Sequence, residues 1–61
     1  MKLTTYLELK RISNSRATKE LRISRQYLYE ILRGRMKPGR KLGQRIVEWS
    51  QGDVRYEDLW N

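Results

Sequence analysis

The sequence of 61 residues contains no cysteine, no histidine and a single proline, Pro38. Without cysteine there is neither a disulfide framework nor a thiolate ligand. Zinc sites and Ser–His–Asp or Cys–His nucleophiles need histidine or cysteine, so these chemistries are excluded as well. The remaining polar residues include no outstanding pair of acids. We therefore expect no catalytic residue, no metal and no other cofactor, and the sequence predicts that the protein is not an enzyme.

Long apolar segments are missing too. No stretch approaches the roughly 20 apolar residues that a membrane-spanning helix needs, and residues 1–8 lack the apolar centre of a signal peptide. A chain this short hides only about 60% of the surface that its unfolded form exposes, so it has little room for a deep pocket. The sequence predicts one cytoplasmic domain over residues 1–61.

The charge is high and unevenly distributed. Lys and Arg number 14 against 7 Asp and Glu, for a formal net charge of +7. Residues 1–45 carry 13 of the basic residues and three acids, whereas residues 46–61 carry Arg55 and four acids. Residues 33–45 hold six basic residues and no acid. A polyanionic partner is indicated, most often nucleic acid and sometimes an anionic membrane.

Capping residues predict two short helices in the first third of the chain. Thr5 and Glu8 match a capping box, which predicts a helix from about Thr4 to Lys10. Ser13 is a good N-cap for a second helix that continues to Leu21. The apolar residues expected on the buried faces of these two helices are Leu3, Tyr6, Leu7, Ala17 and Leu21.

A third helix is predicted from Arg25 to Arg33, with Ser24 as its N-cap and Gly34 at its end. A spacing of about 100° per residue separates two faces. The buried face comprises Leu28, Ile31 and Leu32. The opposite face carries Gln26, Tyr29, Glu30 and Arg33, whose side chains are able to bond base edges or phosphates.

Pro38-Gly39 opens a fourth predicted helix, from about Arg40 to Ser50, with a stripe of Leu42, Ile46 and Trp49. Gly52 closes it. Residues 53–61 predict either a short helix capped by Asp53 or a brief strand, because Val54 and Tyr56 alternate. Trp60 is expected either in the core or at a dimer contact, since tryptophan is enriched at interfaces.

Two short helices joined by a three- or four-residue turn, the second with a polar outer face, form a helix-turn-helix, and residues 13–34 fit it. The sequence resembles the Cro/CI-type phage repressor family over nearly its whole length. The residues that carry the resemblance are Ser13-Asn14, Ala17-Thr18, Leu21, Arg22-Ile23-Ser24, Arg25, Leu28, Ile31-Leu32, Gly34-Arg35, Lys37-Pro38, Leu42, Arg45-Ile46, Gly52-Asp53-Val54 and Glu57-Asp58-Leu59. The resemblance implies an all-α, lambda-repressor-like domain of about five short helices. The alternative is an α+β Cro with a C-terminal hairpin, against which the helical period of residues 42–49 argues.

Two positions depart from the family pattern. Thr18 stands where the family often has alanine. Compared with alanine, threonine adds a methyl-sized volume and a hydroxyl that needs a hydrogen-bond partner. Arg22 stands where the family often has glycine in a left-handed conformation, and a non-glycine residue there costs about 1 kcal/mol or more.

The resemblance also implies the site residues, with Arg25–Arg33 as the recognition helix. The base-reading positions are Arg25, Gln26, Tyr29 and Glu30. Arginine matches guanine, glutamine matches adenine and glutamate accepts from cytosine, while Tyr29 suits a thymine methyl or a phosphate. For Glu30 an ion pair with Arg33 or Arg35 is an equal alternative. The residues expected at phosphates are Asn14, Arg16, Arg33, Arg35, Lys37, Arg40 and Lys41.

We therefore expect a bacteriophage-type transcriptional repressor of Cro type in the cytoplasm of a bacterial host. It would bind double-stranded operator DNA as a weak homodimer that DNA favours. The alternatives are an antitoxin-like or chromosomal helix-turn-helix regulator and a basic RNA-binding protein. A cationic membrane-surface peptide is disfavoured, because the basic residues are spread over several capped helices.

Overall fold

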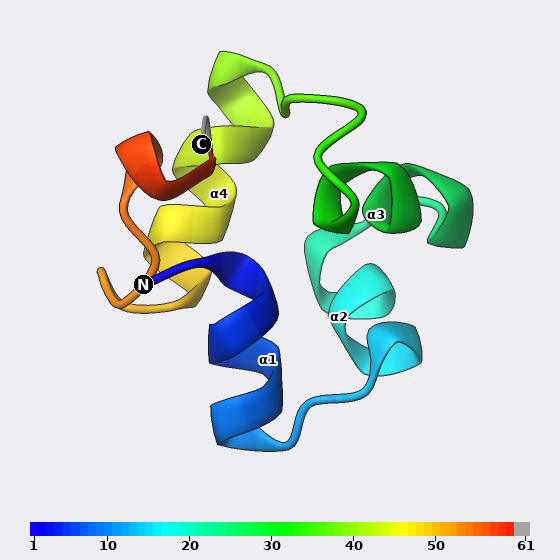
Figure 1. The fold of residues 1–61 in the computed structure, drawn as a ribbon, viewed down its shortest axis with the longest axis horizontal. Helices are drawn as coiled ribbons and strands as arrows, with labels where there is room; N and C mark the ends of the chain where they lie inside the picture. Colours follow the sequence, from blue (N-terminus) through cyan, green and yellow to red (C-terminus); the bar gives the residue numbers. More distant parts are fainter. Residues whose placement is uncertain (60–61) are drawn as a thin grey trace.

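The computed structural model describes residues 1–59, and within them the chain is all-helical, without a strand. The elements are α1 (Leu3–Lys10), α2 (Asn14–Leu21), α3 (Arg25–Leu32), α4 (Arg40–Trp49) and the 3₁₀-helix η1 (Tyr56–Leu59) (Figure 1). The predicted all-α class is confirmed. The predicted count of about five helices is slightly high, because the fifth element is a 3₁₀-helix of four residues. The C-terminal hairpin of the alternative fold is not found in residues 53–59.

One small core holds these short helices together. Helices of 8 to 10 residues are marginal alone in water, so their stability comes from packing. Ala17, Leu21, Ile46 and Val54 are completely buried. The remaining buried apolar residues are Leu3, Tyr6, Leu7, Leu28, Ile31, Leu42 and Leu59. The faces predicted for the helices are thus confirmed, with Leu32 and Trp49 only partly buried at the edge of the core.

The predicted capping box at the start of α1 is wrong. The helix begins at Leu3, with Lys2 as an N-cap that makes no side-chain cap bond. The Lys2 carbonyl accepts the first helical hydrogen bond, from the Tyr6 amide at 2.9 Å. Thr5 therefore lies inside the first turn, beyond the cap position. The burial of Leu3 extends the helix by about one residue, because a tertiary contact outweighs a local signal at a helix end.

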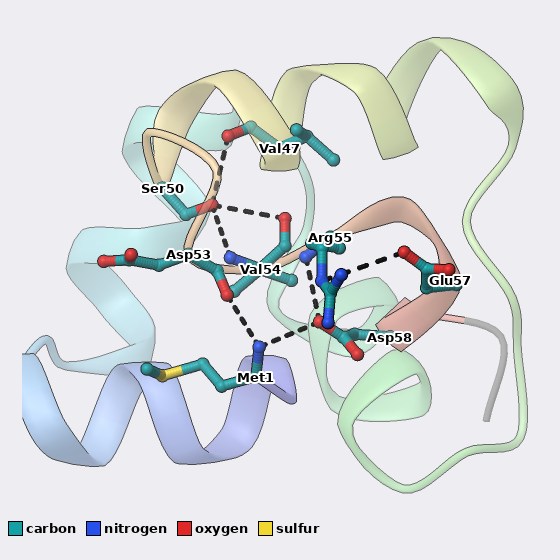
Figure 2. Close-up of polar contacts among 8 residues, drawn as sticks. All are labelled: Met1, Val47, Ser50, Asp53, Val54, Arg55, Glu57 and Asp58. Carbon is teal, nitrogen blue, oxygen red and sulfur yellow. Dashed lines mark hydrogen bonds and ion pairs between the residues drawn. The ribbon is translucent and has the colours of Figure 1, made fainter.

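The N-terminus is fastened to the C-terminal segment (Figure 2). The Met1 ammonium donates hydrogen bonds to the Asp53 carbonyl at 2.7 Å and to the Asp58 carboxylate at 2.8 Å. The same carboxylate accepts from the Arg55 amide at 3.0 Å. The ammonium and this amide lower the pKa of Asp58, in that order of importance. Two ends that lie far apart in the sequence are thereby joined beside α4.

Of the two alternatives for this segment, the short helix is found as η1 and the strand is not found in residues 53–59. The expected cap at Asp53 is wrong, because the turn after α4 is organised by Ser50 and Asp58. The buried Ser50 hydroxyl donates to the Val47 carbonyl at 3.1 Å and accepts from the Val54 amide at 3.0 Å. Val54 and Leu59 turn into the core. The expectation for Trp60 lies outside the described residues.

The helix-turn-helix pair and the rest of the chain occupy different sides of the molecule. In the view of Figure 1, α2 and α3 lie together on one side, and α1, α4 and η1 lie on the other. Arg45 of α4 joins the two, since its Nη1 donates to the Leu21 carbonyl at the end of α2 at 2.7 Å. This bond satisfies a carbonyl that the helix end leaves without an intrahelical partner.

Candidate nucleic-acid interface

The turn between α2 and α3 keeps a left-handed residue although it has no glycine. Arg22 ends α2 with φ 58° and ψ 47°, and its amide bonds to the Lys19 and Thr18 carbonyls. Ile23 then packs against the core, and Ser24 caps α3 by accepting from the Tyr27 amide at 3.0 Å. The departure from glycine at Arg22 thus leaves the geometry intact, at the cost of strain in one residue.

The second departure, Thr18, is also accommodated. Its side chain is buried on α2, with 7% of the residue exposed. The hydroxyl donates to the Ser15 carbonyl one turn earlier, at 2.8 Å. Because the hydroxyl has this partner, it does not carry the cost of an unsatisfied buried polar group.

The start of α2 faces the start of α3. Ser13 caps α2 by accepting from the Arg16 amide at 3.1 Å, which leaves Asn14 exposed as the first residue of the helix. Arg25 of α3 reaches across, and its Nη2 donates to the Ser15 hydroxyl at 2.9 Å. A shallow surface groove between the helices is lined by Asn14, Ser15, Arg25, Gln26 and Tyr29. Three of the predicted base-reading residues therefore meet the predicted phosphate ligand Asn14 at one groove.

The outer face of α3 is arranged largely as its periodicity predicts. Arg25, Gln26 and Tyr29 are exposed, and Glu30 is half-buried. No ion pair joins Glu30 to Arg33 or Arg35 in the described part of the chain, so that alternative is not found. Arg33 instead contacts Tyr29: its Nη1 donates to the Tyr29 hydroxyl at 2.6 Å, and its guanidinium carbon lies 5.1 Å from the ring centroid.

The predicted phosphate ligands after α3 lie in the connection to α4 and at the start of α4. Arg35, Lys37, Arg40 and Lys41 are exposed there, around the buried Pro38. Arg45, the last member of the basic run, is used differently, because it bonds the end of α2. Arg45 is itself exposed, so the run differs at this position in its hydrogen bond to α2 and not in its burial, a difference that the sequence pattern does not reveal.

Arg16, the remaining predicted phosphate ligand, is engaged in an ion pair. Its Nε donates to Glu20 at 2.9 Å, and the other oxygen of Glu20 accepts from the indole nitrogen of Trp49 at 2.7 Å. The hydrogen bonds from Arg16 and then from Trp49 lower the pKa of Glu20. The bond to Glu20 raises the pKa of Arg16. The i, i+4 spacing of Arg16 and Glu20 signals this pair in the sequence, whereas the contact with Trp49, 29 residues away, does not.

Residues 1–59 show neither a metal site nor a membrane-spanning helix. Residues 1–59 contain no group of three or more acidic side chains placed to hold a metal ion. Over the same residues, none of the helices combines the length and the apolar character needed to cross a membrane.

Comparisons with known proteins give no independent identification. No protein-family model matches the chain, and neither a search of curated proteins nor a search of solved structures returns a match.

Proposed function

We propose that the protein is a non-enzymatic, sequence-specific DNA-binding repressor of Cro type that acts in the cytoplasm. One observation carries this proposal: two capped helices bring Asn14, Arg25, Gln26 and Tyr29 to a single exposed groove. Paired helices of this kind place the second helix in the major groove, where the residues near its N-terminus contact base edges.

In this arrangement Arg25 and Gln26 read bases. Arginine forms a bidentate contact with guanine, and glutamine forms one with adenine. The bond from Arg25 to Ser15 restricts the arginine before DNA arrives, which lowers the entropy lost on binding. Asn14 and the amides at the start of α2 suit a backbone phosphate.

The exposed basic residues supply the electrostatic part of the interaction. Arg35, Lys37, Arg40 and Lys41 follow α3 directly and lie at the surface. In the view of Figure 1 the segment after α4 lies on the other side from α3, although Asp58 lines one surface pocket together with Arg33 and Lys37. Two subunits, weakly associated in solution, would bind half-sites about one helical turn apart and repress by occluding a promoter.

The test is selection of bound duplexes from a random pool, followed by titration of the selected site. We expect a two-fold symmetric sequence and a steep salt dependence, with a slope of about −0.9 for each of roughly four to seven phosphates per subunit. Gln26→Ala should cost about 1–3 kcal/mol on the selected site and relax one base position.

Lys41→Ala is the matched control, because it should weaken all duplexes by about the same factor. A flat salt dependence, or preferential binding of RNA over every duplex in the pool, would contradict the proposal.

A further inference from the structure

Tyr29 and Arg33 form a side-chain pair on the exposed face of α3. Half of Tyr29 is exposed, and Arg33 is the exposed residue that ends the helix. Residues four apart lie above one another on a helix surface, which brings the two side chains together. The short bond from Arg33 to the hydroxyl and the approach of the guanidinium to the ring hold both side chains in one arrangement.

This contact determines which hydrogen-bonding groups the pair offers to a ligand. A tyrosine hydroxyl has one proton and two lone pairs, whereas a guanidinium has five donors and no acceptor. Arg33 occupies one lone pair of the hydroxyl, so the hydroxyl proton has to point to another acceptor. Among residues 1–59 no acceptor takes this proton. The pair thus presents an O–H donor beside the remaining N–H donors of a single positive charge.

A ligand that complements this pair has two acceptor oxygens and one negative charge. The non-bridging oxygens of a phosphodiester meet both conditions, and charge-assisted hydrogen bonds to such oxygens are among the strong ones. Base edges suit the pair less well, because base reading falls to the N-terminal residues of such a helix and Arg33 lies at its C-terminal end.

We propose that Tyr29 and Arg33 bind one DNA phosphate jointly, the hydroxyl and the guanidinium each donating to it. Arg33 also positions Tyr29, because its bond to the hydroxyl orients the ring and directs the proton outward. The inference rests on the proposed function and deepens it: of the two contacts that a tyrosine at this position suits, a thymine methyl or a phosphate, it assigns the phosphate.

The experiment is a double-mutant cycle on the selected duplex, measured by fluorescence anisotropy at several salt concentrations. Tyr29→Phe removes only the hydroxyl and should weaken binding about tenfold on every duplex. Arg33→Gln should weaken binding by at least as much and reduce the salt slope by about 0.9. The double variant should bind little worse than Arg33→Gln alone, because both changes remove the same contact.

Two control variants match these changes. Tyr27→Phe removes a hydroxyl from the half-buried flank of the same helix, and Arg55→Gln removes a charge from the C-terminal segment. Both should bind DNA as the unchanged protein does. Circular dichroism of each variant checks that the helices remain folded.

Duplexes with single methylphosphonate linkages then locate the contact. One neutral linkage in each half-site should weaken the unchanged protein and have no effect on Arg33→Gln. If the loss of affinity in the double variant equals the product of the losses in Tyr29→Phe and Arg33→Gln, the two residues act independently and the joint contact is overturned. A change of base preference in Tyr29→Phe, or unchanged binding by that variant, would overturn it as well. Each of these results leaves the proposed DNA-binding function standing. If the unchanged protein binds no duplex, by contrast, both the proposed function and the joint phosphate contact are overturned.

Discussion

The ring of Tyr56 packs directly over Gly43, so closely that a β-carbon on Gly43 would lie 2.8 Å from Cε2 of the tyrosine. Gly43 is buried in the middle of α4, at a position where glycine is otherwise unfavourable for a helix. The contact explains the glycine: it allows the segment after α4 to lie against the helix.

Gly43→Ala should therefore destabilise the protein although alanine is the better helix former. The helix preference favours alanine by about 1 kcal/mol, whereas forcing an atom into a packed contact typically costs about 1–3 kcal/mol. We expect a net loss of about 1 kcal/mol, or a fall of roughly 4–8 °C in Tm for a domain of this size. Thermal unfolding followed by circular dichroism measures the change.

The control is the same substitution in a Tyr56→Leu background, where the crowding is relieved and the alanine should be neutral or stabilising. If Gly43→Ala raises the Tm of the otherwise unchanged protein by several degrees, the ring moves aside freely and does not restrain this segment.

Arg45→Gln should reduce stability without removing a DNA contact. The variant leaves the Leu21 carbonyl at the end of α2 without its arginine donor. The loss expected for such a bond is about 1 kcal/mol. Urea unfolding measures it, and Arg40→Gln on the same helix is the matched control, with stability near that of the unchanged protein. If Arg45→Gln keeps full stability but lowers the salt slope of DNA binding by about 0.9, Arg45 is a phosphate ligand instead.

Acid should weaken the bond between the two ends of the chain. Since the folded protein holds the pKa of Asp58 below its ordinary value, the carboxylate stabilises the fold above the unfolded pKa, near 3.9. That contribution falls as the pH drops from this value through the lower pKa of the folded state. The contribution of Glu20 to stability falls with acid in the same way, because the folded protein lowers its pKa too.

Asp58→Asn should therefore lower the Tm at pH 7 and flatten the decline of Tm between about pH 5 and pH 2. Asp53→Asn is the control, because Asp53 contributes its main-chain carbonyl to Met1 and its side chain is exposed. Equal acid profiles for the Asp58 variant and the unchanged protein would show that the ion pair does not stabilise the fold.

Local sequence signals predicted most of the helical framework. Ser13 and Ser24 cap α2 and α3 as predicted, and α3 ends one residue before its predicted limit, at Leu32. Such features depend on residues within one or two turns of each other, so the sequence alone identifies all the interacting groups. The capping box at Thr5 shows the limit of this reasoning, because a buried Leu3 and a distant partner for Met1 moved the start of the helix.

By itself, then, the sequence determined the class of fold, the buried face of each helix and the basic character of residues 1–45. Only the tertiary structure decided how the charged and polar side chains are used. It turned Arg45 towards Leu21 and tied Arg25 to Ser15, and it placed Glu20 between Arg16 and Trp49. The physical reason is the reach of the interactions: helix caps and apolar periodicity act over three or four residues. The partner of a long side chain, by contrast, is selected only when packing brings distant segments within hydrogen-bonding distance.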